Sequence, residues 1–290
     1  MRGACIDIGS NTTRLLVADY AGRRLTEVHQ QRAFTRIGRG LAASGAIGDA
    51  KIAEVVAVVA GQITAAHEHG AGTIRAVATA AIRRATNGAA LVEAIAGHTG
   101  LTVEILSGEE EARLAFLGAA ATLPRAPAGP LGVIDVGGGS TELVVGRAPD
   151  HVGWWASVDI GSGALTEQCL PSDPPRAQEL AVARAEIASA LGGLEPPSPE
   201  LAVAVGGSAT SLCRLAGPEL DSDALARTLA VLTGEPAGTV ADGYAIDPQR
   251  ARLLPAGLLI LEAIAELLGA PVTVGQGGIR EGVLLEALTA

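Results

Sequence analysis

Aromatic residues are scarce in this 290-residue chain. Phe, Trp and Tyr supply 2% of the residues although hydrophobic residues supply 48%, so the cores must be built from Ala, Val, Leu and Ile. Such cores suit layered α/β packing, in which parallel strands are continuous aliphatic runs. Few aromatic rings also leave few surfaces on which single-stranded nucleic acid could stack, and we expect no nucleic-acid partner.

Cysteine is also rare, and the three cysteines are isolated: Cys5, Cys169 and Cys213. They show neither metal-ligand spacing nor a disulfide framework, which predicts a reducing, cytoplasmic location. No basic and then apolar leader is expected, because Asp7 interrupts the first apolar run. The most apolar late stretch, residues 253–268, contains Glu262 and Glu266, so we expect a buried helix and no membrane partner.

Positive charge is unevenly distributed within a net charge of -10. Residues 14–84 carry ten basic and five acidic residues, whereas residues 114–290 carry nine basic and twenty acidic residues. A basic N-terminal lobe could focus an anionic ligand onto one side of the protein. Chance clustering of charges on a solvated surface explains the same distribution.

Two segments, residues 6–17 and 134–145, match without a gap at an offset of 128 residues. Each is an apolar run, an Asp, a turn of Gly, Ser and Thr, and a second apolar run. This pattern predicts strand, tight turn, strand, with Asp7 and Asp135 entering the turns. A third small-residue turn is expected at residues 206–210, after a strand over 201–205. The repeat suggests two related domains that hold a phosphate chain between them.

These turns have the composition of phosphate-binding loops, because phosphate prefers converging backbone N–H groups without side-chain obstruction and with hydroxyl donors added. One such turn alone is more often structural, but three that follow apolar strands, two of them in repeat, favour phosphate. The candidate phosphate-binding residues in the turns are Gly9, Ser10, Asn11, Thr12, Gly137, Gly138, Gly139, Ser140, Thr141, Gly207 and Ser208.

The carboxylates beside the turns suggest a cation, since a carboxylate alone would repel phosphate. Mg²⁺ takes one or two carboxylates together with water and phosphate oxygens. Asp135 and Glu142 are candidate ligands, with Asp7 as a further candidate, and Arg14 occupies the position of Glu142 in the first repeat. We therefore expect the metal near the second turn. Alternatively, each Asp caps its own turn.

Three consecutive glutamates, residues 109–111, begin a helix, where negative charge is favourable. Ser107 and Glu110 have capping-box spacing, but Glu111 has no such local role and could activate a water. Arg83 follows a strand and a small-residue turn, and its guanidinium could make a bidentate contact with a phosphate group. A surface arginine at a helix start is an equally good explanation of Arg83.

Strand and helix patterns alternate along the whole chain, which predicts layered α/β domains with partly parallel sheets. A break rich in Pro and Gly at residues 124–130 suggests a domain boundary. We expect an N-terminal domain over 1–123, a C-terminal domain over 124–278 and a final amphipathic helix over 279–290.

Several segments together resemble the exopolyphosphatase/guanosine pentaphosphate phosphohydrolase family, in its short two-domain form. They span nearly the whole chain and lie at residues 7–17, 78–85, 105–114, 134–143, 205–210 and 278–282. The family belongs to the superfamily of sugar kinases, heat-shock chaperones and actin. The resemblance implies two actin-like (ribonuclease H-like) domains, an active-site cleft between them, a final helix that crosses back onto the first domain, and a homodimer.

The same resemblance implies roles for particular residues. Glu111 would be the base that activates water, Asp135 and Glu142 would bind Mg²⁺ with Asp7 lining the site, and Arg83 and the turns would hold phosphates. The resulting hypothesis is a phosphoric anhydride hydrolase that releases terminal phosphate from polyphosphate or from guanosine pentaphosphate. An actin-like ATPase or small-molecule kinase, and a non-catalytic sensor of phosphate chains, are the alternatives.

Overall fold

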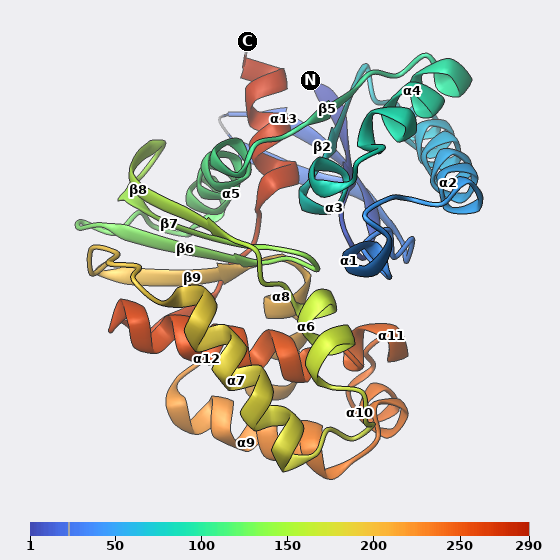
Figure 1. Cartoon of the computed structure of the whole chain (residues 1–290). Coiled ribbons are helices and arrows are strands. Elements are labelled where there is room, and N and C mark those ends of the chain that lie inside the picture. The colour runs from blue at the N-terminus through green and yellow to red at the C-terminus, as the bar shows by residue number, and fades with distance from the viewer. Residues whose placement is uncertain (23, 290) are drawn as a thin grey trace. The chain divides into compact units, whose positions relative to one another are not determined.

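The computed structural model describes residues 1–22 and 24–289. It divides into two compact units, the first formed by Met1–Thr122 and Gly277–Ala290 and the second by Leu123–Gln276. The final helix expected over 279–290 includes Ala290, which lies outside the described residues. Each unit is built on one mixed, five-stranded sheet (Figure 1).

The sheet of the first unit has the strand order β3-β2-β1-β4-β5. β1 pairs antiparallel with β2 and parallel with β4, and β4 pairs parallel with β5. The antiparallel β1–β2 pairing confirms the first expected strand-turn-strand and places Asp7 opposite Arg14. The strand bounds are Arg2–Ile8 (β1), Thr13–Ala21 (β2), Arg24–Ala33 (β3), Thr73–Ala78 (β4) and Val103–Ile105 (β5).

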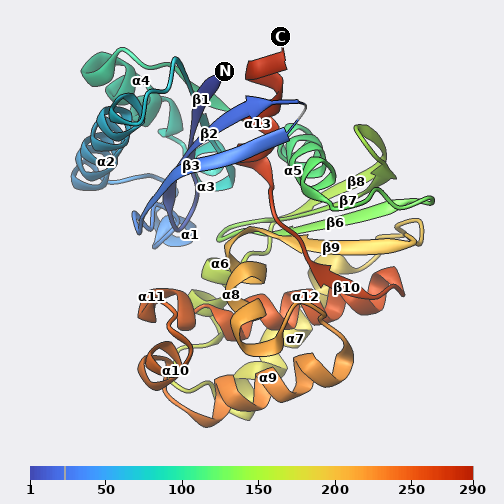
Figure 2. The ribbon, with the colours of Figure 1, turned by 180° about the vertical axis from the view of Figure 1, so that it is seen from behind.

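Helices cover both faces of this sheet because successive side chains of a strand point to opposite sides. Ile6 and Ile8 belong to the core beneath α2 and α4, whereas Cys5 packs in the core beneath α5 and α13. Figure 2 shows these two helix layers on either side of the strands. The helices are Leu41–Ser44 (α1), Asp49–Glu68 (α2), Ala80–Arg84 (α3), Gly88–Thr99 (α4), Gly108–Thr122 (α5) and Ile279–Thr289 (α13).

The sheet of the second unit repeats the plan of the first. Its order, β10-β9-β6-β7-β8, becomes identical to that of the first sheet when β6–β10 replace β1–β5 and the order is read from the other edge. β6 pairs antiparallel with β7 and parallel with β9, so Asp135 lies opposite Glu142. The strands are Leu131–Val136 (β6), Thr141–Arg147 (β7), His151–Val158 (β8), Leu201–Val205 (β9) and Val272–Val274 (β10).

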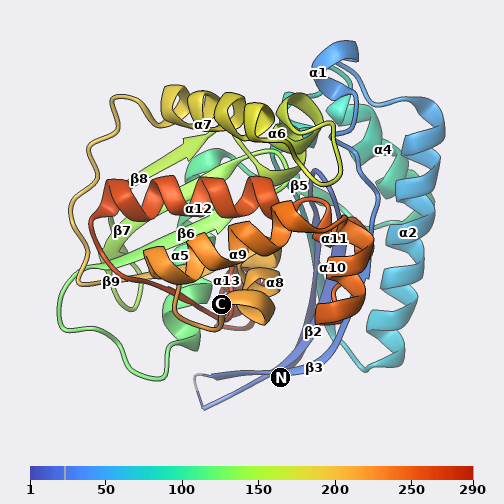
Figure 3. The same ribbon diagram turned by 90° about the horizontal axis from the view of Figure 1, so that it is seen from below.

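A helical layer packs on one face of the second sheet around α12, which contacts α6, α7, α8 and α9 (Figure 3). α12 is the buried helix expected from the apolar stretch over 253–268. Among the described residues, no helix has both the length and the apolar character that a bilayer span requires. The helices are Ser162–Cys169 (α6), Ala177–Leu191 (α7), Gly206–Ala216 (α8), Ser222–Gly234 (α9), Ala237–Tyr244 (α10), Pro248–Ala251 (α11) and Leu254–Leu268 (α12).

The prediction of a separate turn at residues 206–210 is wrong, because these residues form the first part of α8. Gly206 adopts a φ of 81°, in the left-handed region that glycine tolerates, and this one residue turns the chain from β9 directly into the helix. Phosphate could therefore meet a helix N-terminus here, and not an independent loop.

Candidate functional site

The first glycine loop, Gly9–Thr12, connects β1 to β2 and is closed by the Gly9 N–H donating to the Thr12 carbonyl at 3.0 Å. A neighbouring loop packs against it: Gly38 N donates to Ser10 O at 2.8 Å and Arg36 N to Asn11 O at 3.0 Å. In a planar trans peptide the C=O and the following N–H point in opposite directions. The N–H groups of Asn11 and Thr12 therefore point away from this neighbouring loop, as anion binding would require.

The side-chain amide of Asn11 adds a donor to this loop. Its Nδ2 atom is buried and has no hydrogen-bond partner among the described residues. Buried polar atoms are nearly always paired, so an exception calls for a ligand or an ordered water. An orphaned donor in the predicted loop fits a phosphate oxygen.

Parallel strands bring Arg83 and Glu111 to the same end of the sheet as this loop. β1, β4 and β5 run parallel, and their carboxyl ends lead into the Gly9–Thr12 loop, α3 and α5 respectively. Open α/β sheets bind ligands at this end. Arg83, at the end of α3, forms an ion pair with Glu111 in the first turn of α5 and donates to Leu106 O at 2.7 Å.

Burial distinguishes Glu111 from the other two glutamates of this turn. Its side chain is 2% exposed, against 26% for Arg83. Glu110, in contrast, accepts hydrogen bonds from Ser107 N at 2.8 Å and from Ser107 Oγ at 2.9 Å, which confirms the expected capping box. The Ser107 donors, the backbone N–H first, lower the pKa of the Glu110 carboxyl. Glu110 therefore has a local structural role, whereas Glu111 is a buried carboxylate whose partner, Arg83, lies 28 residues away in the sequence.

Replacing Ser107 by alanine should lower the free energy of unfolding at pH 7 by about 1 kcal/mol, as for other lost helix N-caps. Because the pKa of Glu110 is lowered in the folded state, its stabilising contribution is present above its unfolded pKa and disappears as the pH falls through its folded pKa. The difference between wild type and Ser107→Ala should therefore shrink in acid. Urea unfolding of both proteins at pH 7 and in acid measures the two free-energy differences. A difference that grows in acid would contradict the role of Glu110 in the cap.

The second glycine loop, Gly137–Ser140, connects β6 to β7 and is closed by the same bond as the first, here Gly137 N to Ser140 O at 3.0 Å. The start of α6 packs against it: Ser162 N donates to Gly137 O at 2.9 Å and Gly163 N to Gly138 O at 3.0 Å. The N–H groups of Gly138 and Gly139 consequently point away from α6. In both repeats the loop carbonyls accept hydrogen bonds from a neighbouring segment, and the peptide N–H groups therefore point to the opposite side.

Asp135 and Glu142 lie side by side at this loop. Residues opposite each other in antiparallel strands share a face of the sheet, with Cβ atoms roughly 5 Å apart. Glu142 is 2% exposed and accepts a hydrogen bond from Ser157 Oγ at 2.9 Å. No group of three or more His, Cys, Asp or Glu in the described part of the chain could hold a metal ion. Two adjacent carboxylates still match the ligand preference of Mg²⁺, which completes its coordination with water and phosphate oxygens.

Gly206 provides the space that the Asp135 carboxylate occupies. A Cβ atom on Gly206 would lie 2.3 Å from Asp135 Oδ1. A side chain at this position would therefore clash with the carboxylate, and it would also be strained by the left-handed φ. The first loop differs at the corresponding pair, where Asp7 faces Arg14. Burial raises the pKa of the Asp7 carboxyl, and the charges of Arg280 and Arg14 oppose this rise. Only the second loop therefore carries two adjacent carboxylates.

Ser157 is a supporting residue that sequence reasoning missed, since it lies on β8, 15 residues beyond Glu142. If Glu142 binds a metal ion, Ser157→Ala should weaken metal affinity roughly 10- to 100-fold, as other losses of a ligand's hydrogen-bond partner do. Ser172→Ala is a matched control, because it removes another Ser–Glu bond in this unit, that to Glu179. Metal titration of phosphate release measures both, and equal metal dependence in the two variants would contradict a role for Ser157.

Two of the predicted hydroxyl ligands are engaged inside the second unit. Thr141 Oγ1 donates to Ile160 O at 2.6 Å, and Ser208 Oγ donates to Val136 O at 3.2 Å. Both residues are buried. These hydroxyls therefore hold β7 and α8 in place, and the backbone N–H groups of Gly207 and Ser208 remain as candidates for phosphate.

Arg250, beside the start of α8, is another residue that the sequence reasoning did not identify. It is buried on α11, and its guanidinium packs against Gly207, where a Cβ atom would lie 2.6 Å from Nη2. Asp247 caps α11 by accepting from Gln249 N and Arg250 N, which fixes the helix that carries the arginine. Nothing local marks Arg250 in the sequence, because its neighbour Gly207 is 43 residues away.

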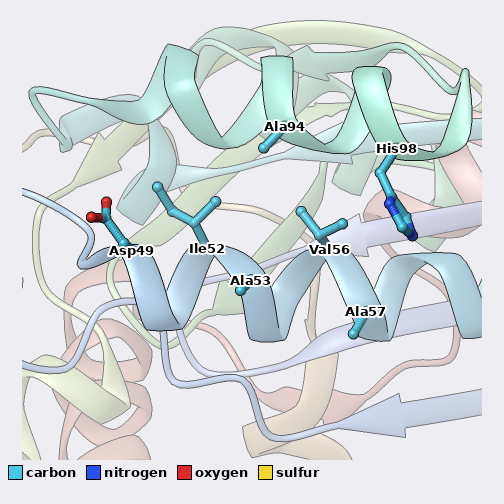
Figure 4. Close-up of a pocket in the computed structure, with 7 residues that line it drawn as sticks. All are labelled: Asp49, Ile52, Ala53, Val56, Ala57, Ala94 and His98. Atoms are coloured by element: carbon cyan, nitrogen blue, oxygen red, sulfur yellow. The ribbon is translucent and has the colours of Figure 1, made fainter.

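A separate groove of about 450 Å³ lies between α2 and α4 in the first unit (Figure 4). It is lined by Asp49, Ile52, Ala53, Val56, Ala57, Ala94 and His98. The lining is mostly apolar and contains Asp49 but no Lys or Arg, so it does not suit a phosphate chain. In each unit, the glycine loop and its charged neighbours remain the candidate functional residues.

Comparison with known proteins adds independent information. The model of the Ppx/GppA phosphatase family matches residues 16–218. Exopolyphosphatase 2 of Mycobacterium tuberculosis is 32% identical over 99% of this chain and 97% of its own length. A guanosine-5'-triphosphate,3'-diphosphate pyrophosphatase of Aeromonas hydrophila is 30% identical. That match covers 97% of this chain and 58% of the length of the relative.

Solved structures show the same fold. The crystal structure of the Ppx/GppA family member of Aquifex aeolicus has a TM-score of 0.83 and 29% sequence identity, and the match covers 100% of this chain and 98% of that one. This neighbour has the actin-like two-domain fold, which confirms the fold expected from the sequence.

Proposed function

This chain belongs to the Ppx/GppA phosphatase family, and from this and its two glycine loops we propose that it hydrolyses terminal phosphoric anhydride bonds. The proposed main substrate is inorganic polyphosphate, because the chain matches an exopolyphosphatase over 97% of that protein. Guanosine pentaphosphate is the proposed second substrate, through the similarity to a pyrophosphatase named for it.

The observation that carries the proposal is the buried Glu111 beside Arg83 at the end of the sheet that bears the first glycine loop. A buried carboxylate held by an arginine is well suited to orient a water and take its proton. The water oxygen then attacks the terminal phosphorus, and the bond from this phosphorus to the bridging oxygen breaks. The shortened chain leaves with the bridging oxygen, and orthophosphate is released.

The glycine loops would supply the electrostatic part of catalysis. We propose that the Gly9–Thr12 loop of the first unit and the Gly137–Ser140 loop of the second each bind phosphate, with their outward N–H groups and Asn11 Nδ2 donating to phosphoryl oxygens. Phosphoryl transfer passes through a loose transition state in which positioning and charge stabilisation do most of the work. Arg83 would hold Glu111 and add positive charge near the transferred group.

Asp135 and Glu142 are the residues that would hold a divalent metal ion, with Mg²⁺ the proposed ion and Asp7 a further candidate ligand. Their shared face, the buried state of Glu142 and its bond from Ser157 support this assignment. A metal bound there would neutralise charge on the phosphoryl oxygens.

A cytoplasmic location and a homodimer complete the proposal. The isolated spacing of Cys5, Cys169 and Cys213 along the sequence supports the reducing compartment. Light scattering of the purified protein tests the dimer, which predicts twice the 29.0 kDa chain mass.

One comparison of substrates tests the proposed function. Purified protein with Mg²⁺ is given polyphosphates of several lengths and guanosine pentaphosphate side by side, and released phosphate is measured. We expect release without any added acceptor and its loss when the metal is chelated. Transfer of a nucleotide's terminal phosphoryl group to an added hydroxyl-bearing acceptor, without release of phosphate, would replace the hydrolase with a kinase.

A further inference from the structure

Two buried atoms of opposite hydrogen-bonding type lie unpaired in the first unit. Asp7 Oδ1 is an acceptor and Arg280 Nη1 is a donor, and neither has a hydrogen-bond partner among the described residues. Arg280 Nη2 is 3.8 Å from Glu281 Oε1, which leaves the other guanidinium nitrogen without a carboxylate. Buried polar atoms are rarely left unpaired unless the position has another use.

The packing of α13 on β1 brings Arg280 toward Asp7. Gly3, Cys5 and Asp7 alternate along β1 and therefore share one face. α13 covers this face, and a Cβ atom on Gly3 would lie 3.1 Å from Leu288 Cδ2 and 3.2 Å from Leu284 Cδ2.

Helix α13 and strand β1 advance by similar lengths from the contact between Leu288 and Gly3. From Leu288 back to Arg280 the helix rises roughly 12 Å, and from Gly3 to Asp7 the strand advances roughly 13 Å. Arg280 thus reaches the end of β1 that enters the glycine loop. The charge of Arg280 opposes the rise that burial causes in the pKa of both Cys5 and Asp7, which agrees with a guanidinium close to this face.

Asp7 creates an electrostatic problem for the loop it enters. It lies two residues before Gly9, is partly buried with its Oδ1 atom shielded from solvent, and would repel the phosphate that the loop is proposed to bind. The charged groups that act on it are Arg14 from β2 and Arg280 and Glu281 from α13. Removing Arg280 would leave Arg14 alone against two carboxylates.

We propose that Arg280 is a positioning residue that offsets and orients the Asp7 carboxylate, so that the Gly9–Thr12 loop can accept a phosphate group. The C-terminal helix would thereby complete the loop formed at the start of the chain. This inference rests on the proposed function, because it assumes that the first loop binds phosphate.

A double-mutant comparison tests whether Arg280 acts through Asp7. The probe is methylenediphosphonate, whose P–C–P bridge cannot be hydrolysed, and its binding is measured by calorimetry. Arg280→Gln should weaken binding about tenfold, a typical coupling between charged neighbours. In an Asp7→Asn background the same substitution should change binding less than about twofold, because the charge to be offset is gone. Arg280→Lys should retain most of the affinity.

Arg113→Gln is the matched control, since Arg113 also reaches α13, in an exposed pair with Glu286, and should leave binding unchanged. Thermal unfolding identifies variants that fail to fold, and Arg280→Met, which also removes the charge, carries the comparison if Arg280→Gln is one of them. Equal losses in both backgrounds, or no loss in either, would overturn the role of Arg280. If wild type binds the probe but hydrolyses no substrate, the proposed function fails and this inference stands. Failure of wild type to bind the probe while it releases phosphate from polyphosphate would overturn this inference and leave the proposed function standing.

Discussion

Glu111→Gln should lower the rate of phosphate release by a factor of roughly 10² to 10⁴, the usual contribution of a general base. Glutamine keeps the shape of the side chain but cannot take a proton from water. Binding of methylenediphosphonate should change little, since the proposed phosphate donors are the glycine loops. Steady-state kinetics and calorimetry on the same preparation measure the two effects separately.

The adjacent Glu110 provides the control for this prediction. Glu110→Gln changes the same functional group one residue away, and glutamine still fits the capping box with Ser107. Its turnover should stay within about twofold of wild type, since only Glu111 is expected to act as the base. Near-normal turnover in Glu111→Gln, or equal losses in both variants, would remove Glu111 from the proposed chemistry.

Gly161→Ala should lower activity by about 100-fold or more, because catalysis is that sensitive to a displacement of about 1 Å. The new Cβ atom would lie 2.5 Å from Gly139 N and 2.6 Å from Gly138 C, both of them backbone atoms of the second glycine loop. A backbone cannot rotate out of the way as a flexible side chain does, so the loop itself must move. The displaced loop would misplace its N–H groups and weaken binding of methylenediphosphonate.

Gly153→Ala is the control for the glycine loop, because its Cβ atom would meet only Val145 O, at an ordinary 3.5 Å. It should leave activity near the wild-type level. Thermal unfolding separates a displaced loop from a general loss of fold. A Gly161→Ala enzyme that is folded and fully active would show that the arrangement of this loop does not matter for catalysis.

The sequence repeat at residues 6–17 and 134–145 predicted an important part of the fold. A gap-free match of apolar run, Asp, small-residue turn and apolar run predicted the hairpins β1–β2 and β6–β7, and both are confirmed. The pairing of β1 with β4 and of β6 with β9 could not be derived from local patterns, because it joins strands across intervening helices. The shared strand order of the two sheets extends the repeat well beyond its matching residues.

The site was predictable where its interactions are local. Capping-box spacing separated Glu110 from Glu111, and the structure bears out the cap. The partner of Glu111, Arg83, lies 28 residues away, and both were identified only as separate candidates. Ser157, Arg250 and Arg280 were missed as site residues, since each meets its neighbour through tertiary packing. The turn predicted at residues 206–210 failed because one glycine sufficed to start α8.

The central claim is that this site transfers the terminal phosphoryl group to water. Hydrolysis of polyphosphate in ¹⁸O-labelled water, followed by mass analysis of the orthophosphate and the remaining chain, tests it most directly. Attack on the terminal phosphorus predicts one ¹⁸O atom in each orthophosphate released and none in the shortened chain. Label in the shortened chain, or transfer of the phosphoryl group only to a hydroxyl acceptor, would contradict the account.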